Sequence, residues 1–206
     1  MTSVDDDDLS DLFGAAISPT DPSLAALHAR LTAEAEATGL LDVAYRTLDT
    51  PVGTLLLAAT PAGLVRVAYE REGLDTVLES LASRVSPRIL NAPRRLDETA
   101  HQLEEYFTGR RHRFDLPLDL SLSAGFRRRV LTYLPGIGYG QTATYQAVAA
   151  AVNNPRAVRA VGTACATNPL PLIIPCHRVI RSDGLLGAYL GGPETKRQLL
   201  NLEAAA

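Results

Sequence analysis

The sequence predicts an α+β protein made of two parts, and three observations support this fold class. Short runs of apolar and β-branched residues, separated by turns rich in glycine and proline, fill residues 43–69 and predict an antiparallel meander. Segments with helical apolar spacing follow it. Beyond residue 123 helices predominate, and two of them are joined by a short turn, which is the helix-turn-helix pattern. A chain of 206 residues, 46% of them hydrophobic, is long enough to bury a core.

The first part is expected to hold a small antiparallel sheet and its helices. Residues 1–22 open with an acidic run and contain little apolar material, so a mobile acidic tail is expected there. The N-terminal domain is expected over residues 23–118, and its first helix begins with Ser23 as the cap. Its other predicted elements are strands at 43–48, 54–59 and 64–69, a helix at 74–85, and a helix with the apolar face Leu96, Ala100, Leu103 and Phe107 that ends at Gly109.

The second part, residues 119–206, is expected to be a mainly helical domain. Helices are predicted at 126–134, at 145–152 with Thr144 as the cap, and at 156–166 with Pro155 at its start. On the last of these, Val158, Val161 and Cys165 are expected to face the core. A second face carries one arginine among small residues, which lets the helix backbone approach a partner closely; the alternative is tight packing within the chain. That face consists of Arg159, Gly162, Thr163 and Ala166.

The distribution of charge suggests the kind of partner. The net charge is −3, but residues 121–206 hold nine basic and only three acidic side chains. A basic half indicates an anionic partner, commonly nucleic acid, although chance clustering would give the same pattern. No apolar run is long enough to span a membrane, and the acidic N-terminus does not resemble a secretory signal. Two cysteines and four histidines supply a zinc cluster poorly, and we expect a reduced, cytoplasmic protein.

Residues 168–179 carry the most unusual chemistry. Three prolines exclude an ordinary helix or a central strand, so the segment is expected to be rigid and extended up to Cys176. His177 and Arg178 follow this cysteine directly, and two cations beside a thiol favour the nucleophilic thiolate. Adjacent side chains rarely face each other. The base therefore acts through a water or is His28, His101 or His112, and Glu203 is a candidate for orienting His177.

A glycine-rich loop follows this motif at residues 183–192. Four glycines in ten residues allow backbone N–H groups to approach a ligand, and Tyr189 in its middle can stack on a planar ring. The alternative is a plain surface loop with a half-buried tyrosine.

The run Pro-Cys-His-Arg-Val and its surroundings, from Phe126 to Glu203, resemble the O6-alkylguanine-DNA alkyltransferase family. The resemblance implies a ribonuclease-H-like N-terminal domain and a helix-turn-helix, winged-helix-like C-terminal domain. It implies direct-reversal DNA repair, in which the protein takes an alkyl group irreversibly from O6-alkylguanine in duplex DNA, with O4-alkylthymine left open. Some relatives bind zinc in the N-terminal domain, but this chain lacks the cysteines for it, so we expect no metal and no cofactor. We expect a monomer in solution, and cooperative assembly on DNA stays open.

The same resemblance assigns catalytic roles. Cys176 resembles the acceptor thiolate, and His177 resembles the base that acts through a water, with Glu203 holding it. Asn168 resembles the residue that braces the recognition helix against the active-site turn. Tyr145 resembles the tyrosine that helps to rotate the nucleotide out and donates to guanine N3.

The remaining implied roles concern DNA and the guanine pocket. Arg159 resembles the arginine that fills the gap in the base stack, on a helix whose small residues Gly162 and Thr163 lie in the minor groove. Leu190 stands where some relatives have serine, so a contact to O6 falls to its backbone N–H. The pocket residues implied are Val179, Gly187, Tyr189 and Leu190.

Two rival functions follow from the same residues. A cysteine hydrolase would use Cys176, His177 and Glu203 with repeated turnover. A binding module or damage sensor would bind alkylated DNA without covalent change. Stoichiometry and covalent modification distinguish these alternatives.

Overall fold

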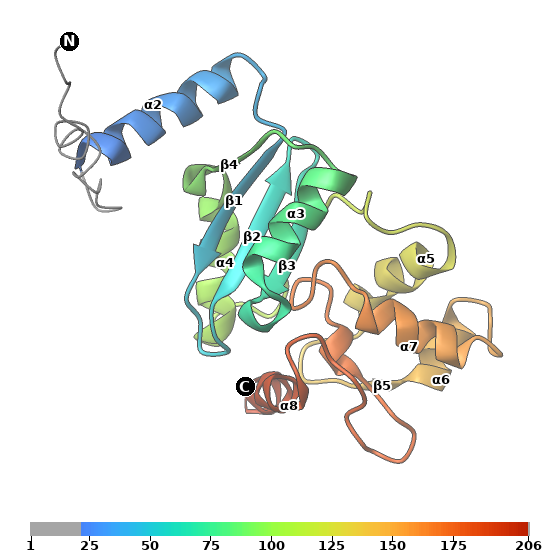
Figure 1. Ribbon diagram of the computed structural model, residues 1–206. Helices are drawn as coiled ribbons and strands as arrows, with labels where there is room; N and C mark the ends of the chain where they lie inside the picture. The colour runs from blue at the N-terminus through green and yellow to red at the C-terminus, as the bar shows by residue number, and fades with distance from the viewer. Residues whose placement is uncertain (1–21, 206) are drawn as a thin grey trace, which may run out of the picture. The chain divides into compact units, whose positions relative to one another are not determined.

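The computed structural model describes residues 22–205, which fall into two compact units divided after Leu40 (Figure 1). In the first unit the described part is residues 22–40, which consist of helix α2 (Pro22–Ala37) and the turn that follows it. The predicted helix is therefore confirmed, but it begins at Pro22, so Ser23 lies inside the first turn and is not its cap. A proline suits this position because the first helical N–H has no partner to lose. The acidic tail expected over residues 1–22 falls, apart from Pro22, outside the described residues.

The second unit opens with a four-stranded sheet in the order β3-β2-β1-β4. Strands β1 (Val43–Leu48), β2 (Leu55–Thr60) and β3 (Gly63–Tyr69) form the predicted antiparallel meander. The short β4 (Ile89–Asn91) runs parallel to β1, so the sheet is mixed and the expectation of a purely antiparallel sheet is wrong. The chain reaches β4 by a crossover through α3 (Leu74–Arg84), as a parallel pair requires.

Helices cover both faces of this sheet, because side chains alternate between the faces along each strand. On one face Leu56 packs in a cluster with Val77 and Leu81 of α3. On the other face Leu57 shares a larger cluster with Leu103 and other residues of α4 (Asp97–Phe107). Gly109, just after α4, has a φ of +71°, which agrees with the predicted end of that helix.

The C-terminal half is mainly helical. It contains α5 (Gly125–Tyr133), α6 (Tyr145–Ala151), α7 (Val158–Ala166) and α8 (Pro193–Ala204), with a two-stranded parallel sheet of β5 (Ala143–Thr144) and β6 (Val179–Ile180). The hydroxyl of Thr144 accepts a hydrogen bond of 3.1 Å from the backbone N–H of Ala147, which confirms the predicted cap. Single 3-10 turns lie at Glu70–Glu72, Pro93–Leu96, Leu134–Gly136 and Cys176–Arg178.

Helices α6 and α7 form the predicted helix-turn-helix pair, with two corrections. Helix α7 begins at Val158, not at residue 156, because the turn after Asn153 (φ +58°) extends through Ala157. Val158 consequently sits at the exposed start of the helix, with 36% of its surface accessible, and does not face the core. Val161 and Cys165 are buried as predicted.

The sheet and the helical half share one apolar cluster. Val67 of β3 donates a backbone hydrogen bond of 2.8 Å to Pro169, just beyond α7, and Leu64 donates one of the same length to Pro117 in the connecting segment. Among the described residues, no helix is both long enough and apolar enough to cross a membrane.

The close approach at Pro117 predicts a destabilising substitution. A Cβ at Gly63, which has a φ of +137°, would lie 2.3 Å from the Pro117 carbonyl oxygen. We expect Gly63→Ala to lower the free energy of unfolding by about 3 kcal/mol, measured by urea denaturation. Gly109→Ala is the matched control, since its φ is also positive but nothing lies within 4 Å of the added Cβ. It should cost only about 1 kcal/mol, and equal losses would contradict the steric argument.

Candidate active site

The proline-rich segment before Cys176 is a compact turn, so the expectation of an extended segment is wrong. Leu172 adopts a φ of +73°, and the N–H of Ile174 donates to the carbonyl of Leu170 at 2.8 Å. The N–H of Cys176 then donates to Ile174 at 2.7 Å, and Cys176–Arg178 form one 3-10 turn. Prolines remove backbone donors and fix φ, but they leave tight turns accessible as well as extended chain.

Asn168 joins the end of α7 to this turn. Its Nδ2 donates to the carbonyl of Ile174 at 2.9 Å and to the Cys176 Sγ at 3.2 Å. Its Oδ1 accepts from the N–H of Leu170 at 3.0 Å. A fully buried amide with all these bonds is held rigidly, so it fixes the position of the thiol relative to α7.

The thiol of Cys176 is buried, with only 1% of the residue exposed. Burial raises its pKa to about 11, against the opposing effects of the Asn168 hydrogen bond and the charge of Lys196. Neither His177 nor Arg178 is the cation that acts on this sulfur, since both turn to Glu203. The hypothesis of two flanking cations is therefore wrong. A thiol with this pKa is protonated at neutral pH and needs a base to react.

His177 lies in the same 3-10 turn as Cys176, and it is the candidate for the base. Its Nε2 lies 2.8 Å from Glu203 Oε1, and its buried Nδ1 has no hydrogen-bond partner among the described residues. In the second unit, His101 is exposed on α4 beside Glu105, and His112 stacks on Tyr139. His28 lies on α2 in the first unit.

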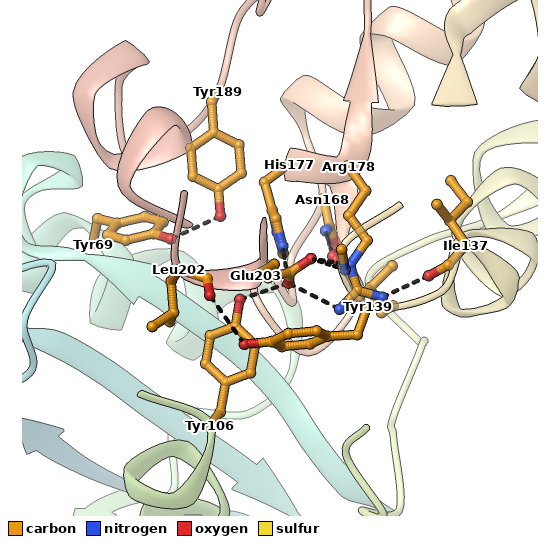
Figure 2. A network of polar contacts seen from close by, with 12 residues as sticks. Tyr69, Tyr106, Ile137, Tyr139, Asn168, His177, Arg178, Tyr189, Leu202 and Glu203 are labelled. Atoms are coloured by element: carbon orange, nitrogen blue, oxygen red, sulfur yellow. Dashed lines mark hydrogen bonds and ion pairs between the residues drawn. The ribbon is translucent and has the colours of Figure 1, made fainter. Parts of the chain in front are cut away.

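The carboxylate of Glu203 is the centre of a buried network (Figure 2). Arg178 donates to both of its oxygens, at 2.8 and 2.9 Å, and the Tyr106 hydroxyl donates at 2.7 Å. The N–H of Gly140 adds a bond of 3.3 Å. Burial alone would raise the pKa of Glu203, but the hydrogen bonds and charges of His177 and Arg178 outweigh it and lower the pKa to about 2.

The same network sets the state of His177. Burial lowers its pKa, and the opposing pull of Glu203 is weakened because Arg178 already neutralises that carboxylate. His177 is therefore neutral at physiological pH and donates its Nε2–H to Glu203. Its Nδ1 is left with an unused lone pair, which is the form a general base requires.

The surroundings of the thiol include aromatic side chains, and the backbone at Gly187 lies close to one of them, Tyr145. Tyr189 is only 9% exposed, and its hydroxyl lies 2.8 Å from that of Tyr69, so its loop is not a plain surface loop. Gly187 has a φ of +70°, and a Cβ there would lie 2.7 Å from the Tyr145 hydroxyl oxygen. Val179 is fully buried, whereas Leu190 is partly exposed.

Lys196 is a site residue that the sequence reasoning missed. It is fully buried, and its Nζ donates to the carbonyl of Val179 at 2.6 Å and to that of Leu186. It thereby joins α8 to the loop that carries Gly187 and Tyr189, and it is the cation that acts on the Cys176 thiol. The available signal was that it is the only lysine in an arginine-rich chain.

Other predicted residues lie on the exposed side of α7, not around the thiol. Arg159 and Thr163 are exposed, and Gly162 is partly so. The Thr163 hydroxyl donates back to the Arg159 carbonyl at 3.2 Å, so it caps no other element. The small-residue face is open for a partner, and tight packing within the chain is not its role.

Two family models match most of this chain. Residues 43–120 match the family described as 6-O-methylguanine DNA methyltransferase, ribonuclease-like domain. Residues 125–205 match the DNA binding domain of 6-O-methylguanine DNA methyltransferase.

Individual relatives give the same result. The methylated-DNA–protein-cysteine methyltransferase of Methanosarcina barkeri is 38% identical over 159 residues, which cover 77% of this chain and 96% of that protein. The constitutive enzyme of Bacillus subtilis is 38% identical over 160 residues, or 77% and 94% of the two chains. The crystal structure of Mycobacterium tuberculosis OGT in complex with DNA superposes with a TM-score of 0.70 at 37% identity, covering 79% of this chain and 93% of that one.

These matches confirm the α+β fold class, the methyltransferase class and the DNA-repair function expected from the sequence. The described residues contain no group of three or more histidine, cysteine, aspartate or glutamate side chains that could hold a metal. The chain belongs to the family of methylated-DNA–protein-cysteine methyltransferases.

Proposed function

We propose that Cys176 takes the alkyl group from O6-alkylguanine in duplex DNA and that each molecule reacts once. One observation carries this assignment: a buried thiol held by Asn168 lies next in the chain to a neutral histidine that Glu203 orients and whose Nδ1 is unused. A protonated thiol, an oriented base and a closed surrounding are the parts that a buried nucleophile needs.

The reaction would proceed as a single displacement. The thiol proton passes through a water to Nδ1 of His177, and the sulfur attacks the alkyl carbon. A carbon–sulfur bond forms as the bond from carbon to guanine O6 breaks, and the electron pair stays on the guanine. Tyr145 would donate to guanine N3 and so stabilise the leaving base. The product is a thioether, which is not a leaving group under these conditions, and the molecule is therefore used once.

DNA binding would use the exposed face of α7. Gly162 and Thr163 let this helix enter the minor groove closely, and Arg159 would fill the gap left by the extruded nucleotide. Extrusion costs a few kcal/mol, least for a weakly paired damaged base. Val179, Tyr189 and the backbone of Leu190 would then surround the guanine.

Several properties remain part of this proposal. They are the domain boundaries at 23–118 and 119–206, a monomeric state in solution and a cytoplasmic location. O4-alkylthymine as a second substrate and cooperative assembly on DNA stay open.

The direct test is the mass of the intact protein after reaction with excess duplex DNA containing O6-methylguanine. We expect one methyl group, located on Cys176 by peptide mapping, and no second equivalent. Cys176→Ser should bind this DNA and accept nothing. Cys165→Ser is the matched control, since that thiol is also buried, within the apolar cluster, but has no assigned part in the reaction, so acceptance should be retained. Repeated turnover would support a cysteine hydrolase, and binding without a mass change would support a damage sensor.

The pH dependence of transfer tests the role of His177. Between the lowered pKa of His177 and the pKa of about 11 for Cys176, the fraction of thiolate–imidazolium pairs does not change with pH. We therefore expect a flat single-turnover rate from about pH 7 to pH 9, with a fall only below the usual histidine pKa of about 6.5.

The variant His177→Gln should remove this plateau. Its single-turnover rate at pH 7 should be lower than that of wild type by a factor of about 100 or more. This rate should then rise with pH as free thiolate accumulates. A wild-type rate that climbs about tenfold per pH unit would contradict a base at this position.

Lys196 is expected to position the acceptor loop and to assist thiolate formation. Lys196→Met keeps the length of the side chain but removes the charge and leaves two carbonyls without their donor. We expect the pKa of Cys176 to rise, alkyl transfer to slow about tenfold, and the free energy of unfolding to fall by about 2 kcal/mol. Thiol alkylation against pH and thermal unfolding measure these effects. Arg197→Met, at an exposed neighbour paired with Glu194, should leave both unchanged. Equal behaviour of the two variants would contradict the role of Lys196.

A further inference from the structure

A cleft of about 400 Å³ lies between α3 of the sheet-containing half and the C-terminal end of α7. The N-terminal half of the chain contributes Thr76, Ser80 and Arg84 of α3 and Arg66 of β3 to its wall. The C-terminal half contributes residues that include Arg127, Ala166, Thr167 and Leu190. Figure 1 shows that α3 and α7 come from the two halves of the chain. The cleft shares Leu190 with the surroundings of the acceptor thiol, but Cys176, His177 and Glu203 do not line it.

The arginines of this cleft differ in how their charges are balanced. Arg66 forms an ion pair with Glu72. Arg84 and Arg127 form no salt bridge with any described residue. Both nevertheless donate from Nη2 to one oxygen, the carbonyl of Leu122, at 3.4 and 2.9 Å. Two like charges therefore converge on a neutral acceptor, which is unfavourable unless an anion joins them.

Two unused hydrogen-bonding groups lie on Arg127, which lines the cleft, and on Ser123, which is next in the chain to the lining residue Leu122. The Nε of Arg127 and the hydroxyl of Ser123 are buried and have no partner within residues 22–205. Ser123 is only 2% exposed and follows Leu122 directly. Buried polar groups are almost always satisfied, so such groups call for a partner that completes them. An oxyanion accepts from several N–H and O–H donors together.

The cleft is continuous with the face of α7 that we assign to DNA. Ala166, which lines the cleft, is the last residue of the face that begins with Arg159, and Thr167 follows it. Leu190, on the opposite part of the wall, belongs to the loop beside the acceptor cysteine. A DNA strand that leaves the end of α7 would therefore meet two unbalanced guanidinium groups.

The geometry points to a phosphate-binding cleft, in which Arg84 and Arg127 hold a backbone phosphodiester of the same duplex whose lesion is repaired. The two arginines also donate hydrogen bonds to the Leu122 carbonyl. Holding this carbonyl in place needs only one donor, so it does not explain why two charges lie here without a counter-ion. The sheet-containing half thus contributes a DNA contact through α3. The inference rests on the proposed function, since it takes α7 as the helix that lies on DNA.

Salt dependence of binding tests this contact on the full chain, with lesion-free duplex DNA as the probe and fluorescence anisotropy as the readout. Each phosphate contact that is lost reduces the slope of log K against log salt by about 0.9. We expect this reduction for Arg84→Gln and a slope close to wild type for Arg84→Lys, which keeps the charge. Arg88→Gln is the matched control, because Arg88 is already paired with Asp42, and it should retain the wild-type slope.

The outcomes separate this inference from the proposed function. An Arg84→Gln slope equal to that of wild type would overturn the phosphate cleft. Inorganic phosphate that raises the Tm of wild type but not of Arg84→Gln, with equal DNA slopes, would show a site for a free anion and would also overturn it. A wild-type protein that binds no duplex, or gains no methyl group on Cys176, would instead contradict the proposed function.

Discussion

The buried carboxylate of Glu203 holds the two halves of the chain and the reactive turn in one arrangement. It accepts from Tyr106 of α4, from the backbone of Gly140 and from the consecutive residues His177 and Arg178. A carboxylate out of water is costly unless its charge is paired and its oxygens are satisfied, and here both conditions are met. Loss of any one partner would leave charge or polar atoms unpaired at the meeting point of α4, α8 and the acceptor turn. The orientation of His177 therefore depends on contacts from across the fold, and not on its neighbour Cys176 alone.

This arrangement explains how a thiol can be both protected and reactive. Burial keeps the Cys176 thiol protonated, so ordinary electrophiles in water meet little thiolate. Arg178 neutralises Glu203, and His177 therefore stays neutral and retains a lone pair on Nδ1. In the proposed reaction, proton transfer from the thiol to His177 would pass through a water beside the sulfur. Asn168 and Lys196 lower the cost of the thiolate once it forms, and their effect is smaller than that of burial.

Local signals in the sequence predicted local structure well and long-range contacts poorly. Turn residues and alternation identified the meander, and Thr144 identified the start of α6. The parallel strand β4 was missed because three residues, Ile89–Asn91, carry no periodicity and pair only through a crossover. Proline content was read as extended chain, although φ at Leu172 makes it a turn. The role of Lys196 was missed, since its acceptors are carbonyls brought near by the fold, and its being the only lysine does not indicate them.

The basic charge of residues 121–206 indicated a nucleic-acid partner, and the structure shows which of these basic residues are neither buried nor paired with acids. Of the nine basic residues beyond residue 120, Arg178 and Lys196 are buried, and Arg181 and Arg197 are paired with acids, so these four add little to the outer field. The five that form no salt bridge with described residues all lie on α5, on α7 or in the turn before α7; they are Arg127, Arg128, Arg129, Arg156 and Arg159. Unpaired positive charge is therefore concentrated on α5, on α7 and in the turn before α7. Arg84 of the acidic half also forms no salt bridge with a described residue, and it lines one cleft with Arg127 of α5. Its charge adds to that of Arg127, because an electrostatic field depends on where charges lie and not on their order in the chain.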